Sequence, residues 1–309
     1  MSQPPRLSIL VISYNTAEMT LECLRSVVAQ TTGDYELIVL DNASPDGSAE
    51  KIAAEFPDIR LIASPDNHGF AAGNNIAAKE ARGEYLLLLN PDTLVLDGAI
   101  DALMDFAQAR PAAKIWGGRT LFGDRSLNPS SCWHRMNLWN VFCRTAGLTG
   151  IFRGSALFNQ ETFGGWDRSD ERQVDIVSGC FFLIRRADWE ALEGFDLAYV
   201  MYGEEADLCL RAERQLGAKP RVTPEATIVH YGGASEAVRA DKMVRLMKAK
   251  TTLINRHFPA WQKPLARWLF GLWPWSRALV ARLRGKDNGG WAEIWARRAE
   301  WRAGYPDAG

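Results

Sequence analysis

The sequence predicts an α/β fold, with a mostly parallel central sheet flanked by helices and a helical appendage at the C-terminus. Three observations lead to this prediction. Short apolar runs alternate with amphipathic helical stretches over roughly the first 120 residues, one of these runs is apolar throughout, and the end of the chain changes composition. A chain of 309 residues, 47% of them hydrophobic, can bury one large α/β domain and a smaller appendage.

Four apolar runs are expected to form strands, at residues 7–13, 35–40, 60–63 and 85–89. Stretches with helical spacing follow them, at residues 16–29, 47–56, 73–81 and 98–109. This alternation is typical of βαβ units, whose strands are parallel. The run 85–89 has no polar residue in alternation, which indicates a central strand covered by helices on both faces.

Residues 121–172 mix polar, glycine and aromatic residues without a period, and we expect a long functional excursion there. After it, the pattern predicts a strand at 176–185, a loop at 194–202 and a helix at 204–216. A short strand at 226–230 and a helix at 239–258 follow. The predicted catalytic domain therefore spans residues 1–258, and residues 259–309 form a separate tail.

Charge and cysteine content exclude several classes of protein. The net charge of −1 offers no bulk attraction to nucleic acid, and no nucleic-acid partner is expected. The five cysteines are widely spaced, with no CxxC pair, which favours a reducing, cytoplasmic compartment. The first residues lack the features of a signal peptide, and no run of about 20 apolar residues predicts a spanning helix.

Polar clusters follow each of the four predicted strands. In an open parallel sheet, ligands bind at the carboxyl ends of the strands, where such clusters would meet. Each cluster taken alone is also an ordinary set of turn-forming residues. The clusters are Ser13-Tyr14-Asn15, Asp41-Asn42, residues 67–75 and Asn90-Pro91-Asp92.

Two of these clusters could hold a nucleotide. Asp41 either binds a donor base or ribose or caps the following helix, and we favour the ligand role because Ser44 and Asp46 are nearer to that helix. Residues 67–75 are rich in small residues and precede a helix, so their backbone could approach a phosphate. An ordinary loop with an asparagine cap explains residues 67–75 equally well.

Acidic residues and one histidine could carry metal and proton chemistry. Asp92 follows the buried strand and could bind Mg²⁺ or Mn²⁺, although it could also be a surface turn acid. His230 ends a predicted strand and could be a metal ligand, although a lone histidine is more often structural. Glu204 and Glu205 open a helix, where the helix dipole favours acids, and one of them could instead be a general base.

Taken together, these segments resemble the GT-A-fold, family 2 glycosyltransferases, and within them the rhamnosyltransferase-like group. The resemblance runs in order from residue 7 to about residue 258. The segments that carry it are SILVISYN at 8–15, DNAS at 41–44, NHGFAAGNN at 67–75, LNPD at 89–92, SGCFFLIRR at 178–186, GFD at 194–196, MYGEEADLCLR at 201–211 and HYGGAS at 230–235.

The resemblance implies a role for each cluster. The donor nucleotide would contact Ser13, Tyr14, Asn15, Asp41, Asn42, Gly69, Asn74 and Asn90. Asp92 would hold the metal ion that bridges the diphosphate, with His230 as a later ligand. Asn90 replaces an aspartate that is common in the family, which leaves open a weak or optional metal. Glu205 would be the catalytic base, although Glu-Glu replaces the usual Glu-Asp pair, so the base could also be Glu204.

The family also implies the chemistry and the partners. The expected reaction transfers a sugar, with inversion, from a nucleotide diphosphate donor to a glycan or lipid-linked acceptor in cell-surface polysaccharide assembly. The subgroup favours deoxythymidine diphosphate-rhamnose (dTDP-rhamnose), and UDP-linked sugars remain open. Residues 121–172 are expected to shape the acceptor site.

The tail at 259–309 combines seven tryptophans with many arginines and lysines. We expect Pro264 and Pro274 to divide it into short helices that lie on an anionic membrane surface, which would make the protein peripheral at the inner face of the membrane. The alternative is a helical hairpin packed on the catalytic domain.

Two other functions remain in view. A nucleotide-sugar pyrophosphorylase needs a Gly-rich, basic loop after its first strand, and Ser13-Tyr14-Asn15-Thr16 occupies that place here. A degenerate transferase could serve as a membrane-bound scaffold, but the retained acids and His230 argue against that function.

Overall fold

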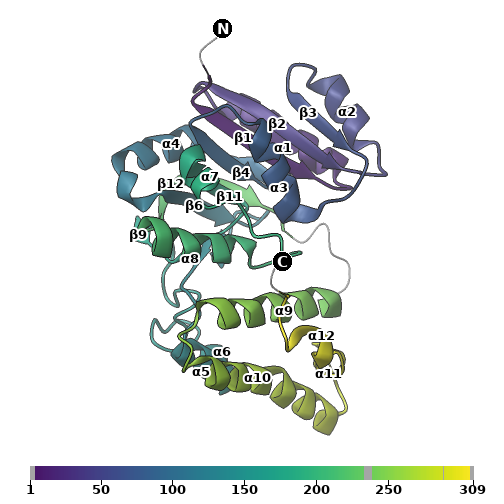
Figure 1. Ribbon diagram of the computed structural model, residues 1–309, viewed down its shortest axis with the longest axis vertical. Helices are drawn as coiled ribbons and strands as arrows, with labels where there is room; N and C mark the ends of the chain where they lie inside the picture. Colours follow the sequence, from purple (N-terminus) through teal and green to yellow (C-terminus); the bar gives the residue numbers. More distant parts are fainter. Residues whose placement is uncertain (1–3, 233–238, 288, 307–309) are drawn as a thin grey trace. The chain divides into compact units, whose positions relative to one another are not determined.

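The computed structural model describes residues 4–232, 239–287 and 289–306, and these form two compact units (Figure 1). The sheet unit comprises Met1–Trp133, Asp167–Asp196 and Leu208–Ser235, and the helical unit comprises His134–Trp166, Leu197–Asp207 and Glu236–Gly309. Residues 233–235 of the predicted HYGGAS segment lie outside the described residues. The helical unit thus groups residues before 258 with the tail, and the predicted functional boundary at 258 stays a prediction.

The first half of the sheet unit alternates strands and helices as predicted. Its elements are β1 (Leu7–Ser13), α1 (Ala17–Gln30), β2 (Tyr35–Asn42), α2 (Ser48–Glu55), β3 (Arg60–Ser64), α3 (Gly69–Glu80), β4 (Tyr85–Leu89), β5 (Thr93–Val95) and α4 (Ala99–Ala109). The strand β2 is two residues longer than expected, because Asp41 and Asn42 still pair with Ala63 and Ser64 of β3.

The second half is more interrupted. Its elements are β6 (Ile115–Leu121), β7 (Leu127–Asn128), β8 (Cys132–Trp133), β9 (Arg172–Gln173), β10 (Ile176–Val177), β11 (Phe181–Arg185), α7 (Arg186–Ala191), α8 (Glu204–Leu216) and β12 (Arg221–His230), with 3₁₀ turns at Pro111–Ala113 and Pro129–Ser131. The expectation of one strand over 176–185 was wrong. The chain pairs with β8 up to Val177 and then, after a turn, with β4 from Phe181.

The ten-stranded sheet has the order β3-β2-β1-β4-β11-β6-β12-β5, with β7 on β6 and β9 on β12. The strands β3, β2, β1 and β4 are parallel, and β11 joins β4 in the antiparallel direction. The pairing of β12 with β5 is also antiparallel and sets His230 opposite Thr93. This non-local pairing brings the chain around residue 230 to the end of β4.

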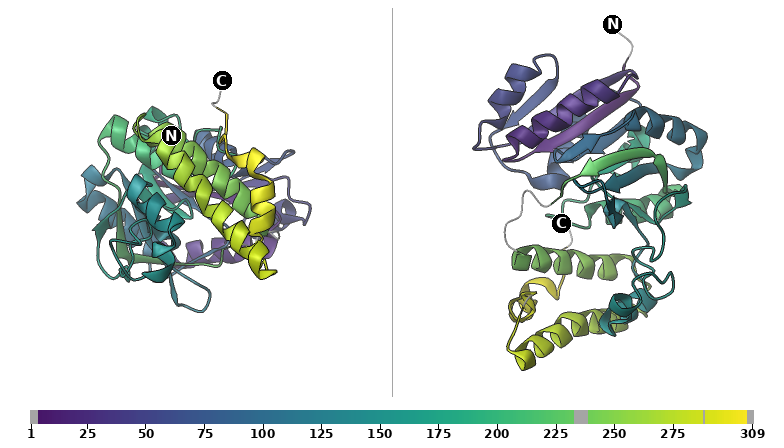
Figure 2. Two further views of the ribbon diagram at one scale, coloured as in Figure 1. Left: turned by 90° about the horizontal axis from the view of Figure 1, so that it is seen from below. Right: turned by 180° about the vertical axis from the view of Figure 1, so that it is seen from behind.

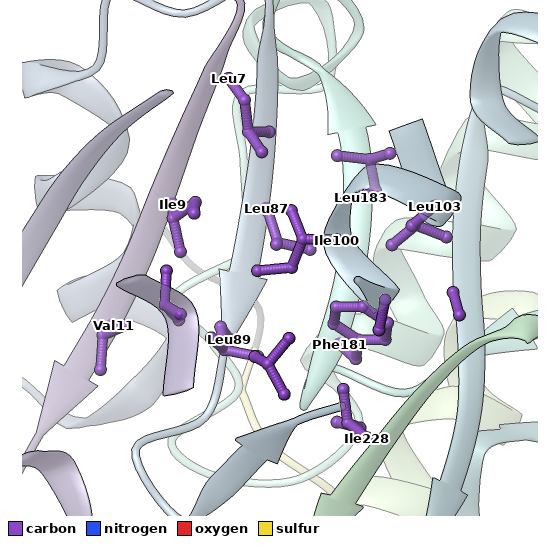
Figure 3. Packing of buried hydrophobic residues seen from close by; sticks show 14 of the residues in the cluster. Leu7, Ile9, Val11, Leu87, Leu89, Ile100, Leu103, Phe181, Leu183 and Ile228 are labelled. Carbon is purple, nitrogen blue, oxygen red and sulfur yellow. The ribbon is translucent and has the colours of Figure 1, made fainter. Parts of the chain in front are cut away.

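Alternating side chains on the strands bury both faces of the parallel half. Ile9 and Leu87 point to one face and share an apolar cluster with Leu24 of α1 and Leu103 of α4. Figure 3 shows Ile100 of α4 beside Leu87. On the other face α3 approaches closely, and a Cβ added to Gly73 would lie 3.0 Å from Ile12 Cγ2. The apolar run at 85–89 is buried throughout, as predicted.

The helical unit is made of α5 (Leu138–Thr145), α6 (Leu148–Ile151), α9 (Arg239–His257), α10 (Lys263–Arg284), α11 (Trp291–Ala296), α12 (Arg298–Trp301) and the first residues of α8. The helix α9 contacts α10, α11 and α12 (Figure 2). The apolar core of the helical unit includes Met247, Ile254, Phe270 and Trp301. Among the described residues, no helix is long and apolar enough to cross a membrane.

The expectation that two prolines divide the tail into short helices was wrong. Helix α10 runs unbroken through both. Pro264 lies in its first turn, where the missing N–H would have had no partner within the helix. Pro274 lies inside and removes one helical hydrogen bond, a cost of about 3 kcal/mol. Burial of Phe270 and Trp273 in the core of the helical unit offsets that cost.

A buried charge cluster joins the 134–166 segment to α9. Glu161 accepts a 2.6 Å hydrogen bond from Arg144 and pairs with Lys250. Burial alone would raise the pKa of Glu161, but the two cations lower it to about 2. The folded state therefore gains stability above the ordinary glutamate pKa and loses it as the pH falls toward 2.

This cluster predicts a large stability effect in the helical unit. Glu161→Gln leaves two largely buried cations without their anion, and we expect a loss of about 3 kcal/mol of unfolding free energy at neutral pH. The wild-type melting temperature should fall between pH 5 and pH 2, and that step should shrink in the variant. Calorimetry across this pH range measures both effects. Equal melting temperatures at neutral pH would contradict the role assigned to Glu161.

Candidate active site

The parallel register places polar residues from neighbouring strands side by side at the carboxyl edge of the sheet. Ser13 of β1 is level with Asp41 of β2, and Val11 is level with Leu89 of β4. Asn90 and Asp92 follow β4 directly. The predicted donor-binding and metal-binding residues of the sheet unit therefore gather at one edge.

Asp92 and His230 form the centre of this edge. His230 Nε2 lies 3.3 Å from Asp92 Oδ1, and the Tyr231 N–H donates to the Asp92 carbonyl at 3.0 Å. The second carboxylate oxygen of Asp92 accepts a 3.1 Å hydrogen bond from the Gly232 N–H. Two residues separated by 138 positions in the chain, which the sequence suggested one at a time, thus form a contacting pair.

The charges of this pair support each other. Burial would raise the pKa of Asp92, but His230 and the nearby backbone amides lower it below its usual range. Burial would lower the pKa of His230, but Cys180 and Asp92 raise it to about 11. The ligand-free pair is therefore a carboxylate and an imidazolium. An ion bound at His230 Nε2 must displace the proton there.

Asn90 adds an oxygen ligand of the kind that hard cations prefer. Its side-chain nitrogen lies 3.3 Å from His230 Nε2. Its Oδ1 atom is buried and has no hydrogen-bond partner within the described part of the chain. A buried polar atom without a partner is costly, and a bound cation or ligand would satisfy it.

The side chains at this edge fit a divalent cation only in part. A carboxylate and an amide oxygen suit Mg²⁺ or Mn²⁺, and the imidazole favours Mn²⁺ of the two. Across the described residues, no group of three His, Cys, Asp or Glu side chains could hold a metal. The remaining ligands would therefore be diphosphate oxygens and water, as is usual for such ions.

Asp41 has the geometry of a ligand-binding residue. It is 3% exposed, its Oδ2 accepts a 3.0 Å hydrogen bond from the Ser44 N–H, and its Oδ1 is buried with no partner among the residues described. The alternative that Asp41 caps α2 is not observed, because Asp46 accepts from the Ser48 N–H at the start of that helix. A free carboxylate oxygen can accept an N–H or O–H from a nucleoside.

Three other predicted donor residues have their polar atoms engaged within the protein. Asn42 donates to the Gly69 carbonyl and accepts from the His68 N–H, at 3.1 Å each. Asn74 donates to the Phe70 carbonyl at 2.9 Å. Ser13 is buried and shares a 2.9 Å hydrogen bond with Thr20. Asn42 thus holds the start of α3, Asn74 bonds to the first turn of α3, and Ser13 bonds to the first turn of α1.

The remaining predicted donor residues lie at loop surfaces. Tyr14 is 43% exposed, so its ring is available to a ligand. Asn15 adopts a φ of 54°, and its N–H donates to Ser44 at 2.9 Å. Gly69 begins α3 with a φ of +74°, a conformation that favours glycine, and its N–H donates to Asn67. Both alternatives for residues 67–75 stay open: Asn67 accepts a hydrogen bond from the first residue of α3, and the N-cap residue itself is His68, whose side chain makes no capping hydrogen bond.

Glu204 and Glu205 belong to the helical unit, at the start of α8. Glu204 is 4% exposed, and burial together with the charge of Glu205 raises its pKa well above the usual range. Burial also raises the pKa of Glu205, which is only partly buried, while backbone amides act in the opposite direction. A general base and a neighbouring carboxylate are expected to have raised pKa values, and both glutamates have this property.

The structure also reveals positioning residues that sequence reasoning missed. The Asn75 side chain makes two hydrogen bonds to the backbone of Phe195, of 2.8 and 2.9 Å. The Arg211 side chain donates to the carbonyls of Leu192 and Gly194. In the helical unit, His257 lies 2.8 Å from Asp207, three residues after Glu204. Asn75, Arg211 and Asp207 all lie in the quoted family segments, which is the signal that could have identified them.

Solved structures identify the class of the fold. A mannosyltransferase of Pyrobaculum calidifontis, PcManGT, in complex with GDP-mannose and Mn²⁺ matches 96% of this chain and 80% of its own, with a TM-score of 0.56 and 18% identity. TarS residues 1–349 of S. aureus in complex with UDP matches 87% of this chain and 70% of its own, with a TM-score of 0.52 and 14% identity. The fold is that of the GT-A glycosyltransferases, as predicted.

The family follows from the sequence match. Residues 8–192, more than half of the chain, match the family described as Glycosyl transferase family 2. The chain belongs to glycosyltransferase family 2 and is a glycosyltransferase. This membership does not favour the pyrophosphorylase or the scaffold.

Individual relatives support the rhamnosyltransferase-like group. The N-acetylglucosaminyl-diphospho-decaprenol L-rhamnosyltransferase of Mycobacterium tuberculosis is 27% identical over 85% of this chain and 88% of its own. The rhamnosyltransferase WbbL of Escherichia coli K12 is 26% identical over 81% of this chain and 96% of its own. The predicted family is confirmed, and these relatives bear out the predicted resemblance to rhamnosyltransferases.

Proposed function

We propose that this glycosyltransferase is an inverting, metal-dependent enzyme that transfers rhamnose, or another sugar, from a nucleotide diphosphate to a lipid-linked or glycan acceptor in cell-surface polysaccharide assembly. The observation that carries the proposal is the Asp92–His230 pair at the carboxyl edge of the sheet, beside the unpartnered oxygen of Asn90. The rhamnosyltransferase relatives support dTDP-rhamnose as the first donor to test, with UDP-sugars next.

The donor nucleotide would bind along the carboxyl edge of β1, β2 and β4. Asp41 Oδ1 would accept a hydrogen bond from the base or ribose, and Tyr14 would lie against the nucleoside. Asn42 and Asn74 would act indirectly by holding the start of α3 in place. The N–H groups in the first turn of that helix that follow Gly69, whose own N–H donates to Asn67, would then face the diphosphate.

Asp92, His230 and Asn90 would hold a divalent cation, Mn²⁺ or Mg²⁺, together with the donor diphosphate. When bound, such an ion neutralises the charge that develops on the leaving nucleotide diphosphate. Asp92 is already ionised, because its pKa is lowered, so it can bind the ion without losing a proton. His230 can bind the ion once its Nε2 proton has left.

Glu205 would be the general base. The more deeply buried Glu204 has the stronger reason to stay protonated, which leaves Glu205 as the ionised member of the pair. Glu205 would take the proton of the acceptor hydroxyl as that oxygen attacks the anomeric carbon opposite the leaving group. A single displacement of this kind inverts the configuration at that carbon.

The acceptor and the location follow from the relatives and the composition. A lipid-linked acceptor is supported by the decaprenol-linked substrate named for the mycobacterial relative. The basic, tryptophan-rich tail supports peripheral attachment at the inner face of the cell membrane. Residues 121–172 would shape the acceptor site.

Asp41→Asn is predicted to weaken binding of the nucleotide sugar by about 10- to 100-fold. The reason is that the new amide N–H₂ would face the nucleoside N–H or O–H from which Oδ1 would accept a hydrogen bond. The turnover number at saturating donor should change much less. The melting temperature should not fall, because the variant no longer buries a carboxylate with one oxygen lacking a partner among the described residues. Donor titration calorimetry and the Michaelis constant measure the effect, and an unchanged donor affinity would remove Asp41 from the nucleotide site.

A thermal-shift screen of nucleotide sugars, each with and without Mn²⁺, tests the proposal as a whole. One donor should stabilise the protein selectively, and more strongly with the ion. Release of nucleoside diphosphate from that donor in the presence of an acceptor should follow. The proposal fails if no nucleotide sugar stabilises the protein or is turned over.

A further inference from the structure

Helix α10 has two apolar faces. One face is buried in the core of the helical unit and includes Ala266, Phe270 and Trp273. The other carries large apolar side chains that are exposed, and we call these six residues the outer stripe. They are Trp261, which directly precedes the helix, Leu265, Trp268, Trp275, Leu279 and Leu283.

The outer stripe is continuous along the helix. Its members recur at intervals of three, four or seven residues, which places them on one side of α10. Trp261 is 76% exposed, Trp268 is 61% exposed and Leu283 is 77% exposed. Scattered exposed apolar residues need no explanation, but a continuous stripe of this size marks an interaction surface.

The charge around the outer stripe indicates what it binds. Residues 259–286 contain six lysines and arginines and no acidic residue. A second copy of this face would bring two sets of cations together, which disfavours self-association through it. An apolar stripe on a segment whose charged residues are all cations instead fits a surface that is both apolar and anionic, as an anionic bilayer is.

A neighbouring segment of the helical unit also exposes large apolar side chains. The Thr145 hydroxyl, just at the end of α5, donates to the Leu269 carbonyl of α10 at 2.9 Å, so the two helices lie side by side (Figure 1). The segment after that contact exposes Ile151, which is 71% exposed, and Phe152. These residues precede α10 by more than 100 positions, and the composition of the tail gave no sign of them.

We propose that the outer face of α10 is the membrane-docking surface of this enzyme, and that the helix lies in the plane of an anionic bilayer with its outer stripe in the interface. Helix α10 is not apolar enough to cross a bilayer, and the basic residues flanking the stripe would contact lipid phosphates. The role of this surface rests on the proposed function, because docking would bring the enzyme to a lipid-linked acceptor.

Vesicle flotation of the full chain tests this proposal. The variant Trp268→Ser/Leu283→Ser removes two exposed members of the outer stripe. The control Val28→Ser/Phe122→Ser removes one aliphatic and one aromatic residue, 53% and 43% exposed, from the sheet unit. Vesicles of phosphatidylcholine with and without phosphatidylglycerol supply the surface, and the melting temperatures confirm folding.

The wild type and the control should float with the anionic vesicles, and the stripe variant should bind them at least about tenfold less tightly. Neutral vesicles should bind all three weakly. Equal binding by wild type and stripe variant, or no binding by the wild type, would overturn the proposal. So would a wild-type dimer that the stripe variant abolishes.

Donor turnover with a water-soluble acceptor, measured on the same proteins, separates the two proposals. The stripe variant should keep wild-type turnover in that assay, because its substitutions lie outside the catalytic residues. Flotation without any turnover would count against the proposed function and leave the docking surface standing.

Discussion

Glu205→Gln is expected to lower kcat by about 100- to 10,000-fold, the usual contribution of a general base. The amide keeps the size of the side chain but cannot accept the acceptor proton. Donor binding should stay close to that of the wild type, since the base acts on the acceptor hydroxyl. Steady-state kinetics with donor and acceptor, combined with donor calorimetry, separates the loss of kcat from any loss of binding.

The pH dependence gives a second expectation for Glu205. A general base must be ionised, and burial raises the pKa of Glu205 above its ordinary value. The wild-type kcat/KM should therefore rise with pH through that raised pKa and fall at lower pH. The residual activity of the variant should lose this acidic limb.

Glu204→Gln is the matched control. If Glu204 is protonated in the folded protein, its amide is a close mimic, and we expect a loss of less than about tenfold. The opposite order of the two variants would assign the base to Glu204. Near-normal turnover in both variants would remove the pair from proton transfer altogether.

Asp92→Asn is expected to produce the second large effect. The substitution removes the ionised ligand of the proposed cation and the partner of His230, and kcat/KM should fall by about 100- to 1,000-fold. The apparent affinity for Mn²⁺ in the presence of a nucleoside diphosphate should also fall. Calorimetric titration of Mn²⁺ measures this second effect without relying on turnover.

Asp105→Asn, an exposed acid on α4, serves as the control for charge and handling, and it should behave as the wild type. A high Mn²⁺ concentration should restore part of the activity of Asp92→Asn, because the remaining ligands still bind the ion weakly. An Asp92→Asn enzyme with wild-type Mn²⁺ dependence would exclude Asp92 as a ligand.

Local sequence patterns predicted most of the first half of the sheet unit, although α3 begins four residues before the predicted start and β5 was not predicted. The runs at 7–13 and 85–89 coincide with β1 and β4, because a continuous apolar run between turn residues has few other structures open to it. The predicted helices at 16–29 and 98–109 agree with α1 and α4 within one residue at each end.

Non-local contacts were beyond those patterns. The contact between Asp92 and His230 depends on the antiparallel register of β12 with β5, which no local spacing encodes. The contact between His257 and Asp207 joins residues 50 positions apart. Pro274 misled the prediction because tertiary packing, and not local propensity, holds α10 together.

The predicted site residues also differ in how far the sequence could identify their roles. Asp41 could be singled out as a candidate ligand-binding residue because nearer residues could cap the next helix, and the structure leaves one of its oxygens without a partner among the described residues. In the sequence, Asn42 is as plausible a donor-binding residue as Asp41. In the structure, its amide oxygen and nitrogen bind the backbone of His68 and Gly69. The hydrogen-bond partners in the folded chain, which the sequence does not show, distinguish a residue with a free polar atom from one that supports the neighbouring loop.

Anomalous diffraction from crystals grown with Mn²⁺ and a nucleoside diphosphate tests the central claim most directly. We predict one manganese peak within about 2.0–2.6 Å of an Asp92 oxygen, His230 Nε2 and oxygens of the diphosphate. The nucleoside should lie beside Asp41. An ordered nucleotide with no manganese at Asp92 and His230, or with the ion held by other residues, would contradict the account.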